Sequence, residues 1–100
     1  MKITFLGVGE GFDENNTHTC ILVEAAGRRM LVDCGATAPP SVWHKSERPD
    51  YLDGIFISHF HADHVFGLPG LMMRMQEDGR TRPFYLFGPV GTQRNVERLM

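Results

Sequence analysis

The sequence predicts an α+β fold, and three observations carry this prediction. Short runs of β-branched and aromatic residues alternate with glycine-containing turns through the first third of the chain. A later segment, residues 68–79, has apolar side chains at helical spacing. The composition, with 42% hydrophobic and 22% charged residues among 100, is that of a globular chain with one modest core.

The first three strands are expected at residues 2–8, 18–24 and 28–33. The loop between the first two, GEGFDENNT, is rich in glycine, aspartate and asparagine, which favour turns over regular structure. A turn at residues 25–27 separates the second strand from the third. Such short connections predict an antiparallel meander.

Residues 35–50 are irregular, and two prolines there precede a stretch that predicts one short helix. Residues 51–58 (YLDGIFIS) contain a continuous apolar run, Ile55 to Ile57. Such a run is typical of a strand that is buried on both faces.

An amphipathic helix is expected next. Its apolar side chains recur at intervals of three and four residues: Leu68, Leu71, Met72 and Met75. Pro69 lies in the expected first turn, and Gly79 marks the expected end. Residues 83–87 (PFYLF) predict a further strand, and residues 91–100 begin another helix.

The charge of the chain gives no bulk electrostatic footprint for nucleic acid. Ten Lys and Arg residues against 12 Asp and Glu give a net charge of −2, and the basic residues are scattered. No run approaches ~18 apolar residues, so we expect a cytoplasmic protein without membrane contact. Cys20 and Cys34 form neither a CxxC pair nor a disulfide framework, which favours a reducing compartment and two buried thiols.

The densest set of potential metal ligands lies in SHFHADH, residues 58–64, directly after the predicted buried strand. Its ligand-type residues are His59, His61, Asp63 and His64. Imidazoles and carboxylates are preferred ligands of zinc and similar divalent ions. All four converge only if the chain turns after His61, and the two resulting pairs suit two metals better than one. Because neither cysteine is spaced to join them, we expect an open catalytic site rather than a closed structural one.

These residues resemble the HxHxDH signature of the metallo-β-lactamase superfamily. Their context is similar too, because Asp33 stands in LVDCG at the end of an earlier predicted strand, as in many members. Within the superfamily, HADHVFGLPGLM and the later FGPVGT look most like the ribonuclease Z group. The resemblance implies half of a four-layer αββα metallo-β-lactamase-type sandwich.

The resemblance also implies a role for each site residue. His59 and His61 would bind one metal, and Asp63 and His64 a second. Asp63 would also handle a proton in catalysis, and Asp33 would orient a ligand without binding metal itself. The implied cofactors are two divalent ions, with Zn²⁺ as the first choice and Mn²⁺ or Fe as alternatives.

Length sets a limit on the resemblance, because the family fold is roughly twice as long and built from two similar halves. The second half supplies another histidine for each metal and a bridging aspartate. His18 and His44 precede the motif and are expected to be ordinary surface or partly buried histidines. We therefore expect residues 1–100 to be the amino-terminal half of the domain, inactive alone, with an exposed apolar sheet face that makes it aggregate or dimerise.

The implied function is hydrolysis of a phosphodiester, or another small ester, by a hydroxide held between two metals in a full-length homodimer. Four alternatives remain open: a ribonuclease Z, a lactonase or thioesterase, a mononuclear iron oxygenase, and a non-catalytic metal-binding scaffold. Two departures from the ribonuclease Z pattern argue against tRNA 3′ processing. DCGATAPP lacks the Glu that usually follows DCG, and GFDENNTH is acidic where that group often carries a basic loop.

Overall fold

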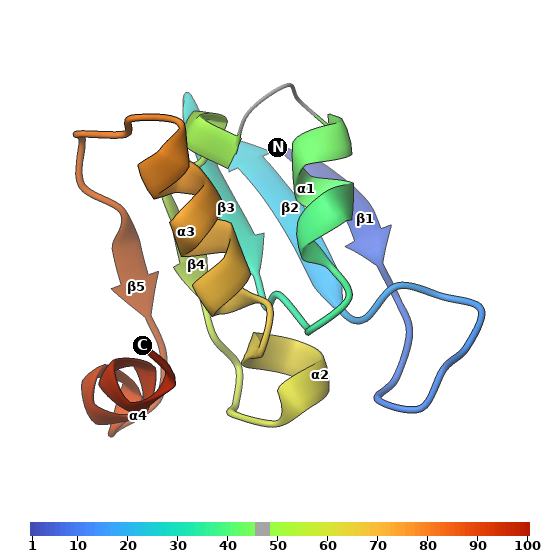
Figure 1. The fold of residues 1–100 in the computed structure, drawn as a ribbon. Helices are drawn as coiled ribbons and strands as arrows, with labels where there is room; N and C mark the ends of the chain where they lie inside the picture. Colours follow the sequence, from blue (N-terminus) through green and yellow to red (C-terminus); the bar gives the residue numbers. More distant parts are fainter. Residues whose placement is uncertain (46–48) are drawn as a thin grey trace.

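Five strands form one mixed sheet, and neighbouring strands follow the order of the sequence (Figure 1). The computed structural model describes residues 1–45 and 49–100. The strands are β1 (Lys2–Gly7), β2 (Cys20–Ala25), β3 (Arg28–Val32), β4 (Gly54–Phe56) and β5 (Tyr85–Phe87). The helices are α1 (Pro39–Lys45), α2 (Ala62–Val65), α3 (Leu68–Glu77) and α4 (Thr92–Leu99), with a 3₁₀ turn, η1, at Pro49–Tyr51. The predicted α+β class is confirmed.

The first three strands form the predicted antiparallel meander. Between β2 and β3 the chain turns through Ala26 and Gly27, whose φ angles are 51° and 75°. Two consecutive positive φ values match a type I′ turn, whose twist suits the flanking strands. The next two strands pair in parallel, β4 on β3 and β5 on β4. Helical crossovers therefore replace hairpins in the second half of the sheet.

Gly54 allows β4 and β5 to approach closely. A side chain at Gly54 would overlap the carbonyl oxygen of Tyr85 and lie 3.1 Å from the Met30 side chain on β3. The glycine is thus required by packing between three strands.

The covered face of the sheet contains the core. One row of residues in register across the strands, Leu22, Leu31, Ile55 and Leu86, faces α1 and α3. Figure 1 shows these two helices lying across the same side of the sheet. The Arg74 guanidinium of α3 lies 5.1 Å above the Trp43 ring of α1, a cation–π contact that joins the two helices.

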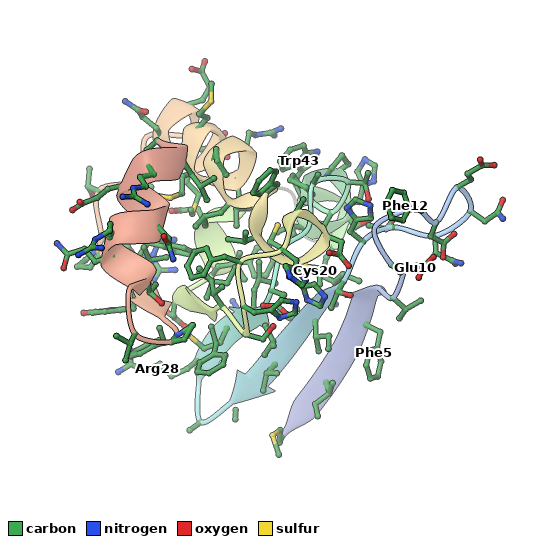
Figure 2. The ribbon with its side chains drawn as sticks, turned by 90° about the horizontal axis from the view of Figure 1, so that it is seen from below. Phe5, Glu10, Phe12, Cys20, Arg28 and Trp43 are labelled. Atoms are coloured by element: carbon green, nitrogen blue, oxygen red, sulfur yellow. The ribbon has the colours of Figure 1, made fainter. Side chains whose placement is uncertain are left out.

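The open face of the sheet is also apolar. The neighbouring row in register consists of Phe5, Ile21, Val32, Phe56 and Phe87. Figure 2 shows Phe5 pointing away from the sheet on the side opposite the helices. The prediction that the fourth strand is buried on both faces is wrong here: Ile55 is fully buried, whereas Phe56 is 48% exposed.

Most element boundaries lie within two residues of the predicted ones, but three differences matter. His18 precedes β2 and pairs only through an isolated bridge to Gly9. Asp33 lies beyond β3, and the short helix α2 was not predicted. Residues 46–48 of the predicted irregular stretch lie outside the described residues. Within the described ranges, no helix is long and apolar enough to cross a membrane.

Candidate metal centre

The site begins where two parallel strands end. Val32 and Phe56 are in register as the last residues of β3 and β4, so the residues that follow them emerge at the same edge of the sheet. The Asp33 N–H donates to the Phe56 carbonyl at 2.9 Å, and the Ser58 N–H donates to Asp33 Oδ1 at 2.7 Å. Parallel pairing thus brings Asp33 against the start of the histidine motif.

Asp33 is the centre of a buried polar network. Its side chain is almost inaccessible to solvent, and its backbone has a left-handed φ of 62°. Besides the Ser58 N–H, its carboxylate accepts from the Ser58 hydroxyl at 2.6 Å and faces His64 Nδ1 at 2.8 Å, both on Oδ2. A sparsely populated φ at a buried, fully used carboxylate is typical of a functional site.

The turn after Asp33 is fastened to α2 by backbone contacts. The Cys34 N–H donates to the His64 carbonyl at 2.7 Å, and the Gly67 N–H donates to the Cys34 carbonyl at 2.9 Å. A side chain at Gly35 would overlap the carbonyl oxygen of Asp63 and the Cβ of His18. Only glycine fits there, so the DCG turn and the motif helix form one rigid unit.

The four motif side chains lie together at this edge of the sheet. The rings of His59 and His64 have centroids 4.0 Å apart, and those of His59 and His61 are 4.7 Å apart and nearly perpendicular. His64 Nε2 lies 3.4 Å from Asp63 Oδ2, and His59 Nδ1 lies 2.9 Å from the Ser58 hydroxyl. The predicted turn of the chain is made by α2, which starts at Ala62.

The chemistry of this donor set fits a divalent metal, because it offers three imidazoles and a carboxylate supported by a second, buried carboxylate. The arrangement is not a closed ligand shell. Among residues 1–45 and 49–100, no three His, Cys, Asp or Glu side chains are arranged to hold an ion. The side chains present here therefore fit part of a metal site, and their roles as ligands stay a prediction.

The loop between β1 and β2 reaches the motif. A side chain at Gly11 would lie 3.6 Å from the Cβ and Cγ of Asp63. Asp13 organises the loop by accepting side-chain and backbone hydrogen bonds from Asn16 and a backbone hydrogen bond from Asn15, and these bonds hold the pKa of the Asp13 carboxyl below its usual range. An acidic loop with no lysine or arginine, residues 8–17, thus borders Asp63.

The remaining candidates fall outside the motif. Cys20 and Cys34 are free and buried, and a hydrogen bond between them, together with burial, raises the pKa of the Cys20 thiol. Such thiols are inert packing groups, as predicted. The expectation that His18 is an ordinary surface or partly buried histidine is wrong, because His18 is only 8% exposed. Its N–H donates to the Thr37 hydroxyl, and its Nδ1 accepts from the Thr37 N–H. His44 is exposed at the end of α1, as expected.

Sequence reasoning missed Ser58 as a site residue. Ser58 is the first residue of SHFHADH and lies directly before His59, and its hydroxyl contacts both Asp33 and His59. The signal was its position at the end of a strand next to a predicted ligand. The contact with Asp33 needed the fold, since the two residues are 25 positions apart.

Comparison with known proteins identifies the family. The family model for the anti-Pycsar protein Apyc1 matches residues 1–96. The chain belongs to the Apyc1 family. The match covers the Asp33 turn and the whole histidine motif of this Apyc1-family chain.

Curated relatives place this Apyc1-family chain in the ribonuclease Z-like part of the metallo-β-lactamase superfamily. Ribonuclease Z from Methanococcus maripaludis is 36% identical over 101 aligned residues, covering 100% of this chain and 33% of the relative. Ribonuclease Z from Bacillus thuringiensis is 37% identical, covering 97% and 33%. The chain therefore spans about a third of the length of the curated relatives it matches.

Solved structures agree with this placement. The short form of human tRNase Z superimposes with a TM-score of 0.84 at 32% identity, covering 100% of this chain and 39% of that one. The metallo-β-lactamase fold protein YhfI from Bacillus subtilis gives a TM-score of 0.81 at 23% identity, covering 98% and 40%, and so supports the fold alone. One helical layer and one sheet layer of the Apyc1-family chain match the predicted half of the αββα sandwich.

Proposed function

We propose that the full-length protein is a metal-dependent phosphodiesterase whose binuclear site includes His59, His61, Asp63 and His64. The hydrogen bond of 2.8 Å between His64 Nδ1 and Asp33 carries this proposal. Metal-binding histidines usually donate their other ring N–H to a carboxylate or carbonyl, which fixes the ring and leaves the opposite nitrogen for the metal. Asp33 holds His64 in this way at the end of two parallel strands.

Each residue has a distinct task in this proposal. His59 and His61 bind one ion, while Asp63 and His64 bind the other. When bound, two divalent ions such as Zn²⁺ supply a nucleophile from water near neutral pH and stabilise charge on the phosphoryl oxygens. Asp63 Oδ2 takes up a proton during the reaction, and Asp33 keeps the His64 ring in place.

The other ligands would come from residues beyond this chain. Two metals need more donors than the four in the motif, and the donors described here do not close around an ion. The chain spans about a third of its curated relatives, which leaves ample sequence for those donors. Residues 1–100 would then be the amino-terminal half of one metallo-β-lactamase-like domain, inactive without the rest.

A small phosphodiester suits the site better than a long polyanion. The loop that reaches Asp63 carries Glu10, Asp13 and Glu14, and it has no basic side chain to neutralise RNA phosphates. Cleavage of RNA is the second candidate, favoured by relatives of 36% and 37% identity that are named ribonuclease Z.

The proposal also includes the location and the oligomeric state of the full-length protein, which we expect to be a homodimer in the cytoplasm.

The test measures metal content and turnover on the same samples of full-length protein. Wild type, His59→Ala and His64→Ala are compared by elemental analysis and by hydrolysis of bis(p-nitrophenyl) phosphate. His44→Ala is the matched control, because His44 is an exposed histidine at the end of α1. We expect about two ions per wild-type chain, with metal and turnover reduced together in both motif variants and unchanged in the control.

Other outcomes would redirect the proposal. Metal without phosphodiester turnover would favour a lactonase or thioesterase if carbonyl esters are cleaved, or an oxygenase if the metal is iron and oxygen is consumed. Turnover of a structured RNA with none of the small diester would favour the ribonuclease Z candidate. A wild-type protein without metal would leave a non-catalytic scaffold.

A further inference from the structure

Ser58 lies between the buried carboxylate and the first histidine of the motif. Its hydroxyl oxygen is 2.6 Å from Asp33 Oδ2 and 2.9 Å from His59 Nδ1. Its N–H is already used, because it donates to Asp33 Oδ1 at 2.7 Å. The hydroxyl therefore has two polar neighbours and one proton to share between them.

The position of that proton follows from the chemistry of the neighbours. An ionised carboxylate can only accept, so the short contact to Asp33 Oδ2 requires the Ser58 hydroxyl to donate. The hydroxyl oxygen then accepts from His59, and His59 must carry its proton on Nδ1. The opposite arrangement would turn the hydroxyl proton to His59 and leave two oxygens 2.6 Å apart with no proton between them.

His64 is held in the same tautomer without an intermediary. Its Nδ1 lies 2.8 Å from the same oxygen, Asp33 Oδ2, which can only accept. Both rings thus carry the proton on Nδ1 and present a bare Nε2. Asp33 reaches one ring directly and the other through the hydroxyl of Ser58.

We propose that Ser58 is a positioning residue that relays the Asp33 carboxylate to His59, so that His59 and His64 both present Nε2 to metal. This inference rests on the proposed metal site and deepens it. His59 belongs to one predicted metal pair and His64 to the other, so one buried carboxylate aligns a ligand of each. Asp33 and Ser58 leave strands β3 and β4 side by side, which gives the relay a rigid base.

The test reads the tautomers directly in the full-length, metal-free protein. Long-range ¹⁵N–¹H correlation spectra distinguish Nδ1–H, Nε2–H and doubly protonated rings, and they are recorded at a pH where the spectra show singly protonated rings. The variants are Ser58→Ala, which removes the hydroxyl, and Ser58→Thr, which keeps it. Ser41→Ala on α1 is the matched control away from the motif. Zinc affinity is measured on the same proteins by competition with a chelator.

We expect wild type, Ser58→Thr and Ser41→Ala to show Nδ1–H rings at both His59 and His64. In Ser58→Ala, His59 should change to a mixture of tautomers while His64 stays unchanged, and zinc affinity should fall about 10- to 100-fold. An unchanged His59 tautomer in Ser58→Ala would overturn the relay, and so would a changed tautomer with undiminished zinc affinity. If wild type bound no zinc, the proposed function would fail, while the tautomers would still decide whether Ser58 makes the relay.

Discussion

The two faces of the sheet have similar side chains and different surroundings. On the covered face Leu22, Leu31 and Ile55 stand in register beneath α1 and α3 and are fully or almost fully buried. Their immediate neighbours in sequence, Ile21, Val32 and Phe56, are equally apolar and form a row on the open face. Successive side chains along these strands thus point to opposite faces of the sheet, but both sets are apolar.

The contrast teaches that the open face is built to be covered. A sheet with one solvated face normally carries polar side chains there, because exposed apolar rows cost free energy and attract partners. The chain spans about a third of the length of its curated relatives, and we expect the rest of the full-length protein to supply a second layer over this face. The histidine motif, residues 58–64, follows the end of β4 at the edge of the sheet where both faces meet.

The largest effect should follow from a truncation on the covered face. Ile55→Ala removes a fully buried side chain from strand β4, which is paired on both sides, and we expect it to lower the free energy of unfolding by about 2–5 kcal/mol. Denaturant unfolding of the full-length protein measures this loss. Val90→Ala, at a fully exposed position, should change stability by less than about 0.5 kcal/mol.

Phe56→Ala tests whether the open face is covered in the full-length protein. In the isolated chain Phe56 is half exposed, so we expect its truncation to cost less than about 1 kcal/mol. In the full-length protein the same change should cost about 3 kcal/mol, because a covering layer would bury the ring. Equal costs in the two proteins would show that this face stays open and would count against the proposed half-domain.

Self-association measures the same face in another way. We expect the isolated chain to dimerise or aggregate through it, and Phe56→Ser combined with Phe87→Ser should weaken association at least tenfold, or about 1.4 kcal/mol. Analytical ultracentrifugation across a concentration series gives the association constant. Val90→Ser is the control, because it also replaces an exposed apolar side chain by serine but lies in the turn before α4. A wild-type chain that is monomeric at every concentration would contradict this expectation.

The covered face could be predicted from sequence because its signals are local. Runs of β-branched and aromatic residues, glycine turns and the helical spacing of Leu68, Leu71 and Met75 placed most elements within two residues. The open face could not be assigned, because a continuous apolar run such as Ile55 to Ile57 is the same whether or not a second layer is present. Burial on that side depends on residues that local patterns do not contain.

The candidate site divides in the same way. His59, His61, Asp63 and His64 stand out because they are adjacent in sequence, and Asp33 came from resemblance to a known family. The relay through Ser58 and the requirement for glycine at Gly35 depend on contacts between segments far apart in the chain. Such contacts appear only in the folded chain, where the ends of β3 and β4 and the residue before β2 lie close together.

The smallest effect on the free energy of unfolding should come from the amino ends of the parallel strands, where polar contacts belong neither to the covered face nor to the open face. Asp53 accepts from the Arg82 side chain and from the Arg29 N–H, both at 2.7 Å, and its own backbone bonds both β3 and β5. These two hydrogen bonds hold the pKa of the Asp53 carboxyl below its usual range. Folding therefore favours the charged form of the Asp53 carboxyl. The contact with Arg82 is partly exposed, which limits its contribution to the free energy of unfolding.

Asp53→Asn should lower the free energy of unfolding by about 1 kcal/mol at neutral pH, where the wild-type carboxylate is charged in both states. Because the folded pKa is the lower one, this stabilisation is present above the ordinary carboxyl pKa of about 3.9 and is lost as the pH falls through the folded value. The difference between variant and wild type should consequently shrink below about pH 4. Urea unfolding of the full-length proteins at a series of pH values measures it, with Glu77→Gln on the exposed side of α3 as the control. A difference that stayed constant with pH would mean that Asp53 acts through its shape rather than its charge. By comparison, Ile55→Ala on the covered face should lower the free energy of unfolding by the same amount at every pH, because it removes no charge.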